Sequence, residues 1–316
     1  MQAHVFPMGN LANQMLQFVF MEGLRKRLPD LAVGGVNLPQ WHIKCELPES
    51  PEAKRLRLYG QFVDRDLLCH LLERGWLHDF EFAGLGFRMD HYPSLDDVRP
   101  LFPRLHATPE RLEDDELLIN VRGAEVLGNL HPDYGPLPIG FLRQLVESTG
   151  LRPVLMGQIA DDWYSESLRQ AFNGCRLIPS RSALEDFDII RSATHVAMSL
   201  STFSWMACWL SHAQTIHMPV VGMFNPQQRP EIDLLPLDDG RYRFYEFDVR
   251  RWTASDQQIA ALHATGEWPE LPAAVLRERL QAASEQWRPF HSRYRRQLLV
   301  AAGLHRLGWS CRVGVS

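Results

Sequence analysis

The sequence is poor in cysteine and lysine, and it has no long hydrophobic run. Its five cysteines are scattered without a Cys-x-x-Cys pair, which argues against a disulfide framework and against a cysteine zinc site. No apolar stretch approaches the roughly 20 residues that a membrane-spanning helix needs, and the first residues lack the basic start and apolar core of a signal peptide. These absences predict a cytoplasmic protein.

Further absences narrow the function. The net charge is −5, so the chain as a whole does not attract nucleic acid, and we expect no nucleic-acid partner. The dinucleotide fingerprint Gly-x-Gly-x-x-Gly does not occur, which argues against a nicotinamide-dependent oxidoreductase. The 13 histidines form no His-x-x-x-His pattern, so a histidine metal site is not indicated. Lys26, Lys44 and Lys54 are the only lysines, so the basic side chains are nearly all arginines, whose planar fork suits phosphate.

The length and composition are those of a globular protein with more than one domain. The chain has 316 residues, of which 45% are hydrophobic and 22% charged. Residues 89–116 are rich in proline and aspartate and have weak periodicity, which is typical of a boundary. We predict an α/β domain over residues 1–115, a Rossmann-like domain over residues 116–250 and a helical segment over residues 251–316.

From residue 116 onward, apolar strand-like runs alternate with helix-like stretches of about ten residues. We expect strands at 116–122, 153–156, 176–178, 195–199 and 215–220, and helices at 139–147, 163–172, 183–192 and 202–211. This alternation predicts parallel βαβ units in a doubly wound sheet. In such sheets, ligands bind at the carboxyl ends of the strands.

The first candidate functional residue is Arg122, which ends the strand-like run Glu116-Leu-Leu-Ile-Asn-Val-Arg122. Gly123 follows it and lets the backbone approach a ligand closely. A guanidinium at this position can bind a diphosphate through two parallel N–H groups. The alternative is a strand-end arginine that pairs with a surface carboxylate, and the residues alone leave both interpretations open.

A second candidate is the hydroxyl-rich turn before the helix at 202–211. Ser201, Thr202 and Ser204 lie where backbone N–H groups at a helix N-terminus can bind an anion without a metal. The alternative is an ordinary cap on a buried helix. A third candidate is the N-terminal loop with Gly9, Asn10, Asn13 and Gln14, which suits a sugar or phosphate near the backbone and equally suits a tight strand-to-helix turn.

The pair Asp186-Phe-Asp188 has the spacing of the metal-binding carboxylates of manganese-dependent sugar transferases. It lies within a helical pattern, where residues two apart point to different faces. We therefore expect no metal site there.

Together these segments resemble the bacterial α-1,2-fucosyltransferases and, more distantly, the α-1,6- and protein O-fucosyltransferases. Gly9-Asn-Leu-Ala-Asn-Gln-Met-Leu-Gln17 is similar to the opening Gly-Gly-Leu-Gly-Asn-Gln-Met-Phe-Gln of that family, and Ile119-Asn-Val-Arg-Gly-Ala-Glu125 to its His-x-Arg-Arg-Gly-Asp. Leu184-Glu-Asp-Phe-Asp188 and Ser199-Leu-Ser-Thr-Phe-Ser-Trp205 are similar to its Glu-Asp-Leu and Asn-Ser-Ser-Phe-Ser-Trp-Trp segments. This sequence departs from the second motif at Asn120, at the single Arg122 and at Glu125.

The resemblance implies an inverting, metal-independent glycosyltransferase of the GT-B type, with two Rossmann-like domains facing a cleft and with C-terminal helices. It implies no cofactor, GDP-fucose as the donor substrate and a glycan acceptor, in surface polysaccharide synthesis. Arg122 would neutralise the leaving diphosphate, and Asp186 would read the guanine edge. The rest of the donor pocket would be Ser201, Thr202, Phe203 and Ser204, and the acceptor-side loop would be Gly9, Asn10, Asn13 and Gln14.

The general base is less defined by the resemblance. Glu125 is our choice because it follows Arg122 by three residues, and His131 and Asp133 in the next loop are the other candidates. A transferase that uses another GDP-sugar, or an inactive glycan-binding relative, would share the same motifs.

The C-terminal segment is strongly basic in a protein of net negative charge. Its arginines are Arg288, Arg293, Arg295, Arg296, Arg306 and Arg312. Helical spacing places Leu299, Val300 and Leu307 away from several of them, which suits peripheral contact with the anionic inner face of a membrane and a lipid-linked acceptor. The alternative is a terminal helix that packs back on the protein with solvated arginines.

Overall fold

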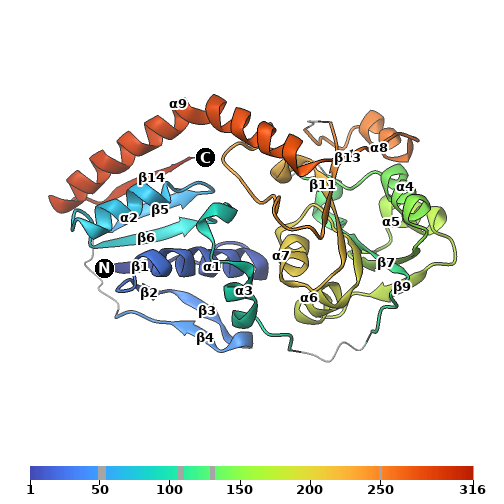
Figure 1. Ribbon diagram of the computed structural model, residues 1–316, viewed down its shortest axis with the longest axis horizontal. Coiled ribbons are helices and arrows are strands. Elements are labelled where there is room, and N and C mark those ends of the chain that lie inside the picture. The colour runs from blue at the N-terminus through green and yellow to red at the C-terminus, as the bar shows by residue number, and fades with distance from the viewer. Residues whose placement is uncertain (49–54, 106–109, 129–131, 249–250, 316) are drawn as a thin grey trace. The chain divides into compact units, whose positions relative to one another are not determined.

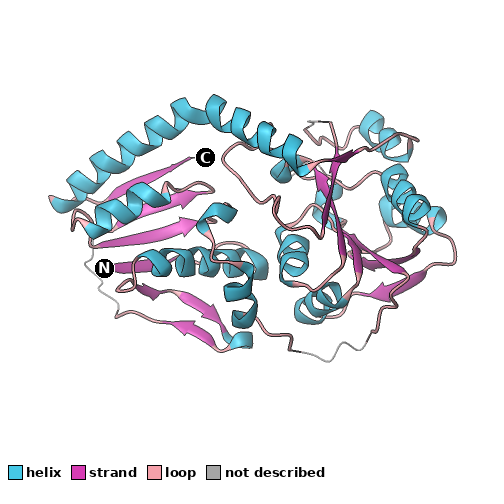
Figure 2. Cartoon of the chain, viewed as in Figure 1, coloured by secondary structure: helices cyan, strands magenta, loops and turns pink. Residues whose placement is uncertain are grey.

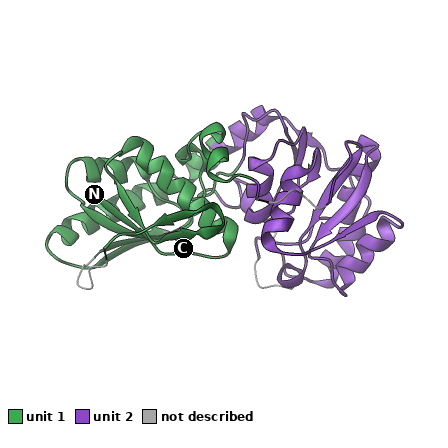
Figure 3. Cartoon of the chain, turned by 90° about the horizontal axis from the view of Figure 1, so that it is seen from below, with its two compact units in different colours: residues 1–103, 230–234, 281–316 green, residues 104–229, 235–280 purple. Residues whose placement is uncertain are grey.

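The computed structural model describes residues 1–48, 55–105, 110–128, 132–248 and 251–315 (Figure 1). The chain divides into two compact units, which Figure 3 colours separately. Unit 1 comprises residues 1–103, 230–234 and 281–316, and unit 2 comprises residues 104–229 and 235–280. Along the chain, the first boundary between the two units lies between residues 103 and 104, twelve residues before the predicted boundary. It also shares residues 251–316, which we predicted as one segment, between the two units.

Unit 1 contains a five-stranded parallel sheet in the order β14-β5-β6-β1-β2 (Figure 2). Its strands are β1 (Gln2–Val5), β2 (Ala32–Gly34), β5 (Leu56–Gly60), β6 (Asp79–Gly84) and β14 (Cys311–Val315), and a separate hairpin joins β3 (Val36–Leu38) to β4 (Ile43–Cys45). Its helices include α1 (Leu11–Arg27), α2 (Arg65–Glu73) and α3 (Leu95–Val98). In β6, Phe80 and Phe82 are fully buried while Glu81 between them is only half-buried, so one face of the sheet is core and the other is partly open.

Unit 2 contains a seven-stranded sheet in the order β13-β12-β11-β10-β7-β8-β9. Its strands are β7 (Glu116–Val121), β8 (Arg152–Gly157), β9 (Arg176–Pro179), β10 (His195–Ala197), β11 (Thr215–Val220), β12 (Tyr242–Glu246) and β13 (Glu270–Leu271). Its helices include α4 (Ile139–Thr149), α5 (Trp163–Ala171), α6 (Ala183–Ser192), α7 (Thr202–Leu210) and α8 (Asp256–His263). All neighbouring strands are parallel except β13, which is antiparallel to β12. The predicted α/β alternation and parallel pairing are therefore confirmed.

The strand order of unit 2 determines where a ligand can bind. Counted along the chain, the six parallel strands lie in the order 3-2-1-4-5-6, the order of doubly wound nucleotide-binding sheets. The chain winds one way from β7 to β8 and β9, and the other way from β10 onward. A crevice therefore opens at the carboxyl ends of β7 and β10, where the winding reverses.

The C-terminal part of the chain differs from the sequence expectation in two ways. From the sequence alone we expect separate helical stretches at 273–287 and 291–307, whereas α9 (Ala273–Arg306) is one continuous helix through Pro289. Its last 26 residues lie in unit 1, where Tyr294, Leu298 and Ala302 are buried. The chain then ends in strand β14, which pairs with β5 more than 250 residues earlier, so no local pattern could reveal it. Within the described residues, no helix has both the length and the apolar character needed to cross a membrane.

Candidate functional site

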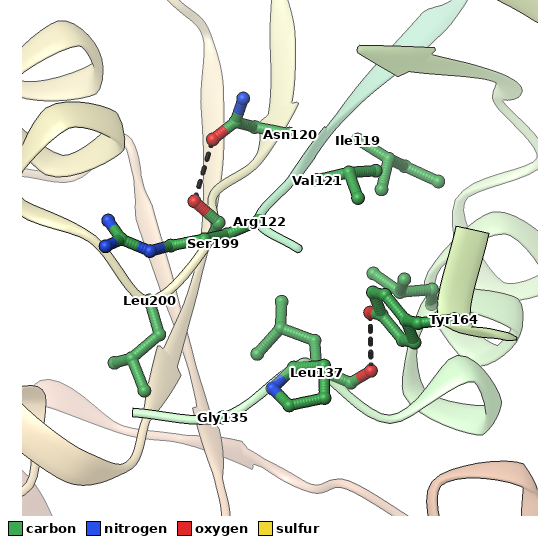
Figure 4. Close-up of a pocket in the computed structure, with 11 residues that line it drawn as sticks. Ile119, Asn120, Val121, Arg122, Gly135, Leu137, Tyr164, Ser199 and Leu200 are labelled. Carbon is green, nitrogen blue, oxygen red and sulfur yellow. Dashed lines mark hydrogen bonds between the residues drawn. The ribbon is translucent and has the colours of Figure 1, made fainter. Parts of the chain in front are cut away.

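The candidate site of unit 2 lies where the winding of the sheet reverses. Arg122 directly follows β7, and Ser199 lies two residues beyond β10. Both line a small pocket together with Asn120, Gly135, Leu137, Tyr164 and Leu200 (Figure 4). The prediction placed Arg122 and the hydroxyl-rich turn at separate strand ends, and the structure brings them to the same pocket.

Arg122 forms the carboxylate pair that one of the two interpretations expected, and its binding of a diphosphate stays a prediction. Its Nη2 lies 2.8 Å from Oε1 of Glu125, so the two predicted catalytic residues form an ion pair. Its Nε is buried and has no hydrogen-bond partner among the described residues. Its guanidinium carbon also lies 6.0 Å from the ring centre of Tyr134. Nη2 of Arg122 is therefore engaged by Glu125, whereas Nε makes no hydrogen bond to the described residues.

The turn after β7 has an unusual backbone that produces this pairing. Ala124 has φ of 51°, a left-handed conformation that costs free energy for a residue other than glycine. A Cβ on Gly123 would lie 2.8 Å from the carbonyl oxygen of Gln158, and the Gly123 N–H donates to Oε1 of Gln158 at 3.2 Å. The turn is therefore held against the end of β8, and it returns Glu125 toward Arg122.

The hydroxyl groups of the β10–α7 turn hold the turn itself. Oγ of Ser199 donates to Oδ1 of Asn120 at 2.7 Å, which joins the two strand ends. The backbone N–H of Ser204 donates to Oγ of Ser201 at 3.0 Å, so Ser201 caps α7 as the alternative interpretation expected. Ser201 and Ser204 are buried, whereas Thr202 and Phe203 are partly exposed in the first turn of α7. The helix N-terminus, with its outward N–H groups, is thereby fixed beside the pocket.

The two aspartates of α6 are directed to different partners. Asp186 is buried and accepts hydrogen bonds from the Ser180 hydroxyl and from the Arg181 N–H at its two carboxylate oxygens. Asp188 accepts from the N–H of Leu105 at 2.9 Å. Across the residues the structure describes, no group of three or more metal-ligating side chains occurs. The guanine-reading role of Asp186 stays a prediction, and its carboxylate orders the turn before α6.

Asp133, one of the alternative bases, is engaged by a second arginine. Its Oδ2 lies 2.6 Å from Nη1 of Arg229, and its Oδ1 accepts from Gln228 at 3.2 Å. A Cβ on Gly222, whose φ is 57°, would lie 2.0 Å from the Asp133 carbonyl oxygen, so only glycine permits this approach. His131, the other alternative base, lies outside the described residues.

The sequence analysis missed the contribution of Arg229. Burial raises the pKa of Tyr134, and the positive charges of Arg229 and Arg122 oppose that shift, so both cations act on one phenol beside the pocket. The signal was the polar run Asn225-Pro-Gln-Gln-Arg229 shortly after β11, another strand end at the same edge of the sheet.

The predicted acceptor-side loop lies in unit 1, between β1 and α1. Gly9 has φ of 63°, and its carbonyl accepts from Nε2 of Gln14 at 3.1 Å. Asn10 begins α1 without a side-chain capping bond. Gln17 belongs to the same motif, and the sequence analysis assigned no role to it. Its side chain is buried, accepts a hydrogen bond from the Met8 N–H at 3.0 Å and donates to the carbonyl oxygens of Phe6 and Gly84. Gln17 therefore fixes the loop, while Asn10 is the N-cap residue of α1 and Asn13 and Gln14 lie in its first turn.

Comparisons with known proteins give a limited result. No family model matches the chain, and no curated protein matches it. Among solved structures, the chain is similar to Arabidopsis thaliana FUT1, solved as a mutant in complex with GDP, at 12% sequence identity and a TM-score of 0.42, over 68% of this chain and 69% of that one. This likeness is too slight to indicate a function.

Proposed function

We propose that unit 2 binds GDP-fucose and that the chain transfers fucose, with inversion and without a metal, to a hydroxyl of a glycan acceptor. One observation carries this proposal. At the point where the sheet's winding reverses, Arg122 lines a pocket beside the N-terminus of α7, and its buried Nε has no hydrogen-bond partner among the described residues. Cationic forks and helix N-termini are the two devices by which proteins bind phosphate without a metal.

In sugar transfer, positive charge and N–H groups are most useful near the leaving group. When the bond between the anomeric carbon and the diphosphate oxygen breaks, negative charge develops on the diphosphate. Fixed positive charge and N–H dipoles that already point there stabilise the transition state more than the ground state. In this proposal, Arg122 and the first turn of α7 supply that stabilisation. Thr202 and Phe203, the partly exposed residues of that turn, contact the nucleotide.

The pairing of Arg122 with Glu125 suggests how the base is released. As the diphosphate takes the Arg122 fork, Glu125 loses its partner and its carboxylate becomes a proton acceptor. The acceptor oxygen then forms the bond to the anomeric carbon, its proton passes to Glu125, and GDP leaves. The side chain of Glu125 is 40% exposed, which leaves it accessible to an acceptor.

The remaining parts of the proposal concern the acceptor and the setting. The ordered loop of Gly9, Asn10, Asn13 and Gln14 would bind the glycan, because amide side chains suit hydroxyl groups. The resemblance supports the further proposal of a cytoplasmic role in surface polysaccharide synthesis.

A second candidate, nucleotide or glycan binding without transfer, is favoured by a specific observation. Both described candidate bases are engaged in ion pairs, Glu125 with Arg122 and Asp133 with Arg229. Binding of GDP without turnover would support this candidate. So would GDP binding that is unchanged when either carboxylate is replaced.

A thermal shift experiment tests the nucleotide site that both candidates share. Stabilisation by a ligand follows RT ln(1 + [L]/Kd), which is about 2.7 kcal/mol at 100 times the Kd. We expect GDP to raise the melting temperature, and GMP and UDP to raise it less, because one lacks the second phosphate and the other lacks guanine. Absence of any shift at millimolar GDP would contradict the proposal.

A further inference from the structure

Exposed apolar side chains gather at the amino-terminal edge of the unit 1 sheet. Leu304, Leu307 and Trp309 are 40%, 76% and 64% exposed, and Trp76 after α2 is 49% exposed. Because β5, β6 and β14 are parallel, the segments that lead into them lie at the same edge. The guanidinium of Arg306 lies 6.0 Å from the ring centre of Trp76, which brings the two segments together. We call these four apolar residues the edge cluster.

The edge cluster is held in a fixed geometry. The backbone N–H groups of Leu307 and Trp309 both donate to the Leu304 carbonyl oxygen, at 3.0 and 3.1 Å, and so close the end of α9. Val300 is 63% exposed and lies one turn before Leu304, so it extends the apolar stripe along the helix. The opposite side of α9, with Tyr294 and Leu298, is buried, so the exposed stripe is not the side that holds the helix on unit 1.

A basic recess adjoins the edge cluster, directly after Trp309. It has a volume of about 600 Å³, open solvent included, and its lining is Arg55, Arg57, Glu81, Ser310, Cys311 and Arg312. Arg312 is the register neighbour of Arg57, and Arg57 that of Glu81, so the three lie in a row across the partly open face. We call Arg55, Arg57 and Arg312 the arginine recess.

The charge of the arginine recess is incompletely balanced. Among the described lining residues, Glu81 is the one acidic side chain, and its Oε1 lies 2.5 Å from Nε of Arg57. The buried Nε of Arg55 has no hydrogen-bond partner among the described residues. The pKa of His4 is lowered, mainly by burial and next by the positive charge of Arg55, and the negative charges of Asp79 and Glu81 oppose this shift. The described lining of the recess thus holds three arginines and one carboxylate, which suits a phosphate group.

We propose that this edge of unit 1 docks on an anionic phospholipid bilayer. The edge cluster enters the interfacial region, where tryptophan and leucine lose contact with water, and the arginine recess takes the phosphate oxygens of a lipid headgroup. The combination of exposed aromatic and aliphatic side chains with an unbalanced basic recess distinguishes a lipid surface from a soluble anion. Docking here leaves the opposite, carboxyl edge of the sheet, with the Gly9 loop, free. The proposal does not depend on the transferase activity.

Co-sedimentation of the full chain with vesicles tests this proposal. We expect binding to vesicles of phosphatidylglycerol and phosphatidylcholine at low salt, weaker binding at high salt, and little binding to phosphatidylcholine alone. The double variant Leu307→Ser, Trp309→Ser removes the most exposed apolar groups and is expected to weaken binding at least about tenfold. The double variant Arg55→Gln, Arg312→Gln is expected to weaken it by about tenfold or more, since each arginine near headgroups contributes roughly fivefold.

Matched controls come from exposed positions in unit 2. Leu177, which is 46% exposed, and Arg143, on the surface of α4, allow Leu177→Ser and Arg143→Gln, both expected to bind vesicles like the unaltered chain. Failure of the unaltered chain to sediment with anionic vesicles at low salt would overturn the proposal. The proposal would also be overturned if the two double variants bound anionic vesicles as strongly as the unaltered chain. A concentration-dependent dimer that Trp309→Ser abolishes, without any vesicle binding, would overturn it too, since a second copy of the chain would then occupy this surface.

Discussion

Replacing Arg122 by lysine separates charge from geometry at the proposed leaving-group site. Arg122→Lys keeps one positive charge but loses the planar fork, including the buried Nε–H, which has no partner among the residues that the structure describes. Loss of one donor to a developing oxyanion typically lowers turnover by about 100- to 1,000-fold, which corresponds to about 2.7 to 4 kcal/mol. We therefore expect turnover with GDP-fucose, followed as GDP release, to fall by about 100-fold or more.

The same change should leave folding nearly intact. The Arg122–Glu125 pair is partly exposed, and exposed pairs contribute about 0 to 1 kcal/mol, so the melting temperature without ligand is expected to change little. Arg152→Lys is the matched control: Arg152 forms a two-bond pair with Asp115 at 2.8 and 2.7 Å, at the amino-terminal edge of the same sheet. Near-normal turnover in Arg122→Lys, or an equal loss in Arg152→Lys, would refute the reasoning.

Three further predictions address the metal, the helix cap and the pH dependence. Transfer activity is expected to survive EDTA, because Arg122 and the α7 N-terminus supply the positive charge; complete loss that manganese restores would contradict this. Ser201→Ala removes the cap of α7 and should lower the free energy of unfolding by about 1 kcal/mol in urea titrations. It should also weaken GDP binding, and an unchanged GDP affinity would show that the cap does not contribute to the nucleotide site. Burial lowers the pKa of His217 to about 4, from about 6.5 when unfolded, so the unfolded chain binds a proton first and stability falls as pH decreases from about 6.5 to 4. His217→Gln should make that fall shallower by up to about 1.4 kcal/mol per pH unit, and an unchanged slope would argue against a buried neutral His217.

The sequence predicts unit 2 well because its signals are local. The strands from Glu116 to Val220 are short runs with apolar residues, and α5, α6 and α7 each begin at a side-chain cap, Asp162, Ser182 and Ser201. Parallel pairing then places Arg122 and Ser199 at one edge without further information.

The features that the sequence did not predict depend on long-range contacts or on single backbone angles. Strand β14 exists because Cys311 and its successors pair with β5, far away in the sequence. The Arg122–Glu125 pair depends on the left-handed φ of Ala124, and the Asp133–Arg229 pair joins residues almost 100 positions apart. Helix α9 continues through Pro289 because packing of its buried side outweighs the lost backbone bond.

A donor-panel transfer assay tests the central claim most directly. The full chain is incubated with GDP-fucose, other GDP-sugars and UDP-sugars, each with candidate glycan acceptors, and the released nucleoside diphosphate is measured. We predict acceptor-dependent release of GDP from GDP-fucose, at a rate well above that with any UDP-sugar. Release from UDP-sugars alone, or no release from any GDP-sugar although GDP binds, would contradict the proposed transferase.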